Sequence, residues 1–147
     1  PSGADSGSYY VDAETTSPGS PGVEFSMSRD FRNDIGSINA VTFQYSMYGA
    51  TMGTVELQGS DDGGSTYTTL WSKSGNQGTG WSGVEVTITS EFPQVLQFVY
   101  TAGSDYQGDF ALDYIEVPRR AHCPPIHPSP YCAFFRLQPT PLPSNHR

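Results

Sequence analysis

The chain has 147 residues, only 15% of them charged, and a net charge of −8. Its length allows one domain with a stable core and terminal extensions. The seven basic residues do not cluster, apart from the neighbours Arg119 and Arg120, which argues against nucleic-acid binding and electrostatic membrane docking. No apolar run approaches the ~20 residues of a membrane-spanning helix. A removed signal peptide or a trimmed chain would explain the start at Pro1.

Short segments of alternating apolar and polar residues predict β-strands throughout the first 117 residues. The expected strands are residues 9–14, 23–28, 38–48, 54–58, 66–72, 84–89, 95–100 and 109–117. Turn-forming residues separate them, including SPGSPG at 17–22 and DDGG at 61–64, where Asp-Gly favours a hairpin. No helical periodicity lasts beyond one turn. The expected fold class is therefore all-β, an antiparallel β-sandwich.

The closing strand shows a slip in its alternation. Phe110 and Leu112 share one face, and Ile115 and Val117 resume the apolar pattern one position out of phase. A slip of this kind predicts a β-bulge near Asp113, which would turn that side chain toward a site at the rim of the sheet.

Residues 118–147 differ in composition from the rest of the chain and predict an extended, Pro-rich tail. They hold eight of the twelve prolines and all three histidines. Cys123 and Cys132 predict a disulfide in this tail, with two free thiols as the alternative. Phe134, Phe135 and Leu137 are apolar enough to dock on the chain's own domain or on a neighbouring copy. The candidate O-glycosylation sites are Ser17, Ser20, Ser129 and Thr140.

Six segments, in this order, resemble a MAM domain, an extracellular jelly-roll module. They are YYVDAE (9–14), SPGSPG (17–22), FQYSMYG (43–49), MGTVEL (52–57), LWSKSGNQG (70–78) and GDFALDYI (108–115). The resemblance covers roughly residues 5 to 117 and implies a domain over residues 1–117. It also implies a secreted or cell-surface setting, with adhesion and assembly as the function and no catalysis.

The resemblance further implies a cation site near the closing strand. Carried over by position, Asp113 and Asp5 are the expected ligands, with Asp109 nearby, and calcium suits their oxygen atoms. The alternative is that Asp109 and Asp113 only cap turns or bond to the backbone.

Two departures from the family pattern suggest how the molecule works. The family's cysteines are missing from the body, and its first strand has no counterpart before Pro1. A sandwich that lacks a strand exposes an edge and part of its core, which invites pairing with another chain. We therefore expect a homo-oligomer in which a neighbour's strand, or its tail around residues 133–137, fills the gap. Repeated head to tail, this contact would build a filament.

Residues 1–117 contain no His and no Cys, so the common general bases and thiol nucleophiles are missing and an enzyme is not expected. The alternative function is glycan binding, as a carbohydrate-binding accessory domain of a larger secreted protein. The aromatic side chains that would form a platform for sugar are Tyr9, Tyr10, Tyr48, Trp81 and Tyr106.

Overall fold

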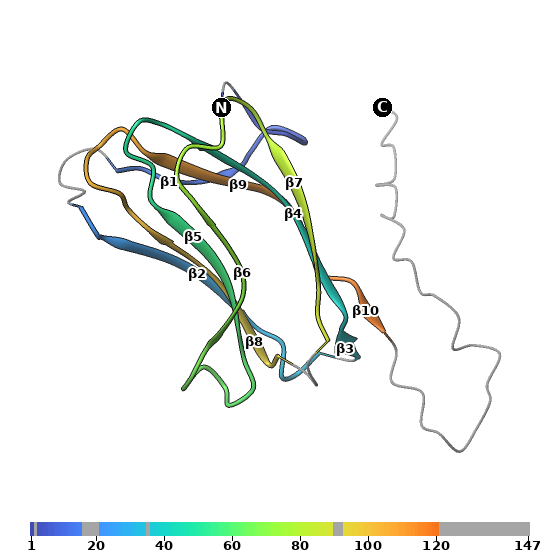
Figure 1. Cartoon of the computed structure of the whole chain (residues 1–147). Helices are drawn as coiled ribbons and strands as arrows, with labels where there is room; N and C mark the ends of the chain where they lie inside the picture. Colours follow the sequence, from blue (N-terminus) through green and yellow to red (C-terminus); the bar gives the residue numbers. More distant parts are fainter. Residues whose placement is uncertain (2, 16–20, 35, 90–92, 121–147) are drawn as a thin grey trace, which may run out of the picture.

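A computed structural model describes residues 1, 3–15, 21–34, 36–89 and 93–120. Within these ranges every helix or strand element is a β-strand (Figure 1). The strands are β1 Val11–Ala13, β2 Glu24–Asp30, β3 Ser37–Ile38, β4 Ala40–Tyr48, β5 Thr54–Ser60, β6 Thr68–Ser74, β7 Ser82–Thr87, β8 Val95–Thr101, β9 Asp109–Glu116 and β10 Arg119–Arg120. The described part contains no helix with the length and apolar character to cross a membrane.

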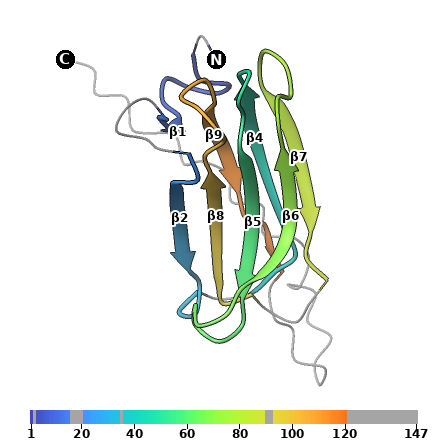
Figure 2. The same ribbon diagram turned by 60° about the vertical axis from the view of Figure 1, so that its left-hand side comes forward.

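Eight of the strands form two antiparallel sheets that pack face to face (Figures 1 and 2). We call them the β4 sheet, in the order β1-β9-β4-β7, and the β5 sheet, in the order β2-β8-β5-β6. Neighbouring strands come from distant parts of the sequence, as in the pairing of Val11 with Leu112 and of Phe25 with Tyr100. The predicted antiparallel sandwich is confirmed, with the long crossing connections of a jelly roll.

The alternation predicted for the central strand forms one wall of the core. Val41, Phe43, Tyr45 and Met47 on β4 are each at most 5% exposed. The ring of Phe43 meets Phe98 of β8 edge-on, with 4.9 Å between the ring centroids. Such pairs contribute ~0.5–1.5 kcal/mol beyond the burial of apolar area. Aromatic contacts therefore join the two sheets at the centre of the sandwich.

The predicted bulge lies on β9. Asp113 pairs with Gln44 and Glu116 pairs with Thr42, so two residues of β9 stand opposite a single residue of β4. Tyr114, one of the two, has a φ of 49°, a conformation that residues other than glycine seldom adopt. The extra residue moves the alternation of the strand by one position, as its sequence predicts.

The described fold continues to Arg120, three residues beyond the domain boundary expected at 117. Antiparallel pairing of Arg119 with Ile38 joins β10 to β3. The carbonyl of Pro118 also accepts a hydrogen bond from the Asn39 N–H at 3.4 Å. Residues 118–120 therefore belong with the body, and the remainder of the predicted tail lies outside the described residues.

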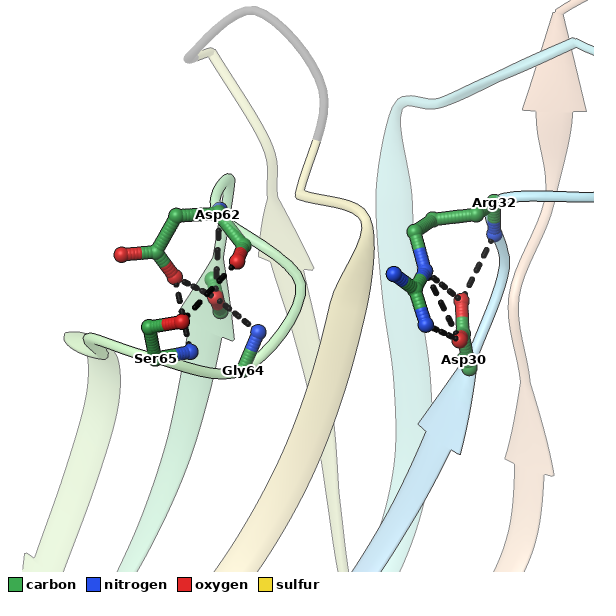
Figure 3. Close-up of polar contacts among 6 residues, drawn as sticks. Asp30, Arg32, Asp62, Gly64 and Ser65 are labelled. Atoms are coloured by element: carbon green, nitrogen blue, oxygen red, sulfur yellow. Dashed lines mark hydrogen bonds and ion pairs between the residues drawn. The ribbon is translucent and has the colours of Figure 1, made fainter.

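At one end of the sandwich, carboxylates hold the loops that follow β2 and β5 (Figure 3). Asp62, in the predicted Asp-Gly turn, accepts hydrogen bonds from the backbone N–H groups of Thr66 and Ser65, each at 2.9 Å. These bonds hold the pKa of the Asp62 carboxyl far below its usual range. The side-chain bonds of Arg32 likewise lower the pKa of Asp30. This end is closed by short, local polar contacts.

At the opposite end, the loops that follow β4 and β8 pack backbone against backbone. The hydroxyl of Tyr100 lies between them, donating to the Gly108 carbonyl and accepting from the Gly53 N–H at 3.1 Å. A Cβ atom at Gly103 would lie 1.8 Å from the carbonyl oxygen of Thr51. No side chain fits such an approach, so glycine is required there.

We expect Gly103→Ala to lower the free energy of unfolding by about 3 kcal/mol or more, because the new methyl group forces the two loops apart. Chemical denaturation followed by circular dichroism measures the change. Gly3→Ala is the control, since nothing lies within 4 Å of a Cβ atom at that position. A Gly103→Ala chain as stable as the control would contradict the backbone contact.

Candidate functional site

Exposed aromatic side chains gather at the end of the sandwich where Tyr100 joins the loops. Tyr48, the last residue of β4, is 57% exposed, and Trp81 comes directly before β7. Both line a hollow of about 500 Å³ that also contains Thr79. Tyr10 meets Trp81 edge-on, with 5.7 Å between the ring centroids. Tyr48, Trp81 and Tyr10 of the predicted platform therefore lie near one another.

The other two aromatic residues of the predicted platform lie elsewhere on the surface. Tyr9 is 88% exposed and Tyr106 is 54% exposed, and neither lines the hollow of Tyr48 and Trp81. The Tyr106 hydroxyl accepts a hydrogen bond from the Gln107 side chain at 3.3 Å. The sequence pattern does not distinguish the five aromatic residues, because the distances between them depend on loop geometry.

Tyr48 also lines a second hollow, of about 430 Å³, whose other lining residues include three polar ones. Asn76, Gln107 and Asp109 contribute side chains to it. Asp109 is held in place by Thr15, whose backbone N–H and hydroxyl lie 3.2 and 3.1 Å from Asp109 Oδ1. We call the two hollows that share Tyr48 the Tyr48 groove. It has an aromatic side and an amide- and carboxylate-bearing side.

The N-terminal loop, residues 3–10, crosses the outward face of the β4 sheet and is held at both margins. Trp81 Nε1 donates a hydrogen bond to the Gly3 carbonyl at 3.0 Å. Farther along, the Ser6 N–H donates to Asp113 Oδ2 at 2.9 Å. Ser46, which points outward on β4, is only 1% exposed. Asp113 faces this loop through the regular alternation of β9 rather than through the bulge, whose extra residue comes after it.

The carboxylates predicted to bind calcium hold different segments of the chain. Asp113 bonds to the N-terminal loop and Asp109 to Thr15. Among the described residues, no group of three acidic, His or Cys side chains is placed to hold a metal ion. Asp5, Asp109 and Asp113 therefore do not form a ready-made cation cage in this arrangement, and calcium binding stays a prediction.

Several predicted sites lie outside the described residues and stay predictions. They are the disulfide of Cys123 and Cys132, the docking residues Phe134, Phe135 and Leu137, and the glycosylation candidates Ser17, Ser20, Ser129 and Thr140.

A second surface feature is an apolar groove along the edge of the sandwich formed by β1 and β2. The three-residue β1 pairs only with residues 110–112 of β9, so residues 113–116 have β4 as their only strand partner in the described part of the chain. Two hollows, of about 370 and 210 Å³, open there and share Met27 and Phe98. We call them together the edge groove. Its main apolar residues are Phe25, Met27, Phe31, Phe98, Ile115 and Val117.

Two arginines stand at the mouth of the edge groove. The guanidinium carbons of Arg29 and Arg119 lie 4.9 and 5.0 Å from the ring centroid of Phe31. Both guanidinium groups donate to Asp34 Oδ2, Arg29 at 3.3 Å. Such cation–π contacts are favourable by ~0.5–1 kcal/mol at exposed sites. Sequence analysis missed this cluster, because Asp34 and Arg119 are 85 positions apart.

Comparison with protein families explains the architecture. The family described as MAM domain, meprin/A5/mu, matches residues 2–124. The chain belongs to the MAM family.

The relatives of this MAM domain include MAM domain-containing glycosylphosphatidylinositol anchor protein 1. The Rattus norvegicus protein is 33% identical over 117 residues, and the Gallus gallus protein is 30% identical over 124 residues. These matches cover 79% and 82% of this chain but only 12% and 13% of the relatives. The chain thus spans about an eighth of the length of the curated relatives it matches.

Among solved structures, the MAM domain is similar to a carbohydrate-binding module in complex with β-1,4-galactotriose. The TM-score is 0.54 at 14% sequence identity, covering 79% of this chain and 74% of that one. At this identity the likeness establishes the shared jelly-roll fold.

The anchoring of the N-terminal loop makes stability depend on pH. The backbone N–H of Ser6, and then that of Tyr114, lower the pKa of the Asp113 carboxyl. A lowered folded-state pKa means that the charged carboxylate stabilises the fold above its unfolded pKa of about 4. The stabilisation is lost as the pH falls through the folded-state value. We expect Asp113→Asn to lower the melting temperature at neutral pH, with the difference from wild type shrinking toward pH 3.

Thermal unfolding of both proteins between pH 7 and pH 3 measures this convergence. Asp61→Asn is the matched control, because Asp61 is exposed and makes no hydrogen bond with another described side chain. Equal melting temperatures for wild type and Asp113→Asn at pH 7 would show that the loop does not depend on the carboxylate.

Proposed function

We propose that this MAM domain is a non-catalytic, extracellular adhesion module that self-associates. The proposed contact is the insertion of an extended segment from one copy into the edge groove of another. The observation that carries the proposal is the edge groove itself, where the short β1 leaves β9 half unpaired and core residues line an open hollow. An unpaired strand edge beside apolar surface favours the addition of one more strand.

The occupant we propose is residues 133–137 of a second copy, with the sequence AFFRL. In an extended segment Ala133, Phe135 and Leu137 share one face, and five residues span ~17 Å. That face would enter the apolar groove and leave Arg136 on the other side. The segment is the most apolar part of the C-terminal sequence.

Charge also favours contact between the tail and the body. Residues 1–120 contain all fifteen acidic and five of the seven basic residues, which leaves them a net charge of −10. Residues 121–147 contain no acidic residue and carry Arg136 and Arg147. Asp12 lines the edge groove, where it faces solvent. Opposite charges of this kind raise association rates and help to set the register of a contact.

The extracellular setting and the lack of catalysis rest on further support. The relatives are named as glycosylphosphatidylinositol anchor proteins, and such an anchor holds a protein at the outer cell surface. We propose the same extracellular setting for this chain. Residues 1–120 contain no His and no Cys. Because one copy's tail enters another copy's groove, the contact is heterologous, and its repetition gives an open filament.

We expect the apparent mass of the wild-type chain to rise with concentration from roughly 1 μM to 1 mM, as measured by light scattering after gel filtration. Met27→Asp, which places a charge in the groove, should keep the protein monomeric. Phe135→Asp should do the same from the tail side. Tyr67→Asp is the matched control, because Tyr67 and Met27 are both 37% exposed. It should associate like wild type.

A wild-type chain that stays monomeric throughout this range would contradict the proposal. This holds even if the tail docks on the domain of its own chain. Association that persists in Met27→Asp would place the contact on another surface. Circular dichroism spectra of the variants show whether each retains its fold.

A second candidate function is glycan binding. It is supported by the exposed aromatic side chains around Tyr48 and by the fold shared with the module solved in complex with β-1,4-galactotriose. The two functions use different surfaces, since none of the residues that the structure describes lines both the edge groove and the Tyr48 groove.

A further inference from the structure

We propose that the Tyr48 groove binds a chain of neutral hexoses, with the ring of Tyr48 as the platform on which a sugar stacks. This inference rests on the second candidate function above and assigns its site, its residues and its class of ligand. Ligand sites in proteins combine aromatic surface with a few well-placed polar groups. The Tyr48 groove has both, in two hollows that share Tyr48.

The aromatic side of the groove suits the apolar face of a pyranose ring. Tyr48 is 57% exposed and Trp81 lines the same hollow. Large, flat side chains of this type offer contact area at a small cost in conformational entropy. The Trp81 ring is fixed by its bond to the Gly3 carbonyl and by its edge-on contact with Tyr10. A stacked sugar would therefore meet rings that are already in place.

The polar side of the groove suits sugar hydroxyls, which both donate and accept hydrogen bonds. Asn76 uses Oδ1 to accept from the Gly78 N–H at 2.9 Å, and no hydrogen bond from its Nδ2 is found within the described residues. Asp109 Oδ1 accepts hydrogen bonds from Thr15, and no hydrogen bond to Asp109 Oδ2 is found within the described residues. One donor group and one acceptor atom thus remain for a ligand, on two residues that line the second hollow of Tyr48.

The loops around the groove are held before any ligand arrives. Gln77 donates its backbone N–H to the Met47 carbonyl and its side chain to the Ser74 carbonyl, both at 2.8 Å. Across the groove, the Thr51 N–H donates to the Gln107 carbonyl at 3.2 Å. Pre-organisation of this kind lowers the entropy that binding costs.

Charge selects neutral sugars. Among the described residues, no Lys or Arg lines either hollow of the Tyr48 groove, and Asp109 adds a carboxylate to it. The whole chain carries a net charge of −8. Sulfated, sialylated or uronic acid sugars would meet the Asp109 carboxylate with no Lys or Arg side chain among the described lining residues to pair with. Neutral hexoses meet no such penalty.

The test is a nuclear magnetic resonance titration of the full ¹⁵N-labelled chain with lactose, cellotriose and maltotriose. The chain has two tryptophans, and Trp71 packs edge-on against Phe43 in the core. We expect at least one of the three sugars to shift the indole N–H signal of Trp81 and leave that of Trp71 unchanged. Tyr48→Ala should weaken binding roughly tenfold or more, and Tyr48→Phe should retain it.

Tyr67→Ala is the matched control, an exposed tyrosine directly before β6 that lies outside the groove and should bind like wild type. The proposal is overturned if none of the three sugars shifts the Trp81 signal, if Tyr48→Ala binds like wild type, or if 3′-sialyllactose binds as tightly as lactose. The same titration of Met27→Asp separates the two functions, because loss of self-association should leave sugar binding unchanged.

Discussion

The fold depends on one apolar interior that two sheets share, with Phe43 at its centre. Its ring meets Phe98 from the β5 sheet at 4.9 Å and Trp71 of β6 at 5.1 Å, both edge-on. β4 supplies this ring and its buried neighbours. Residues of β7 and β9 that pair with inward-facing residues of β4 therefore also face the core. A one-residue slip would expose the whole set, so the register is strongly fixed.

The two ends of the sandwich are built differently, and this difference locates the candidate site. At the Asp62 end, carboxylates bond to backbone N–H groups a few residues away. At the Tyr48 end, glycines allow the loops to pack backbone to backbone around the Tyr100 hydroxyl. That close packing leaves aromatic and amide side chains on the surface, attached to loops that are already held. Rigid loops with exposed functional side chains are typical of recognition surfaces.

The edge groove follows from the length of a single strand. With three residues, β1 covers three of the eight residues of β9, and the bulge then turns Ile115 and Val117 toward the hollow that remains. Arg29 and Arg119 place their charges over Phe31 at its mouth, while the surrounding chain is acidic. Bulges and charges are devices that keep strand edges from pairing at random. Here they border the edge groove, which we propose accepts an apolar, extended segment.

The sequence by itself determined the all-β class, the eight strands of the two large sheets, the inward residues of β4 and the bulge of β9, because each is written in a period-two pattern. It also identified the family, through short segments such as GDFALDYI. It did not predict the short strands β3 and β10. Only the tertiary structure decided which of the five aromatics meet, that Asp113 holds the N-terminal loop, and that Arg29, Phe31, Asp34 and Arg119 form one cluster. Ser6 and Asp113 are 107 positions apart in the sequence, and Asp34 and Arg119 are 85 apart. Local periodicity carries no information about such pairs, since loop paths and sheet order bring them together.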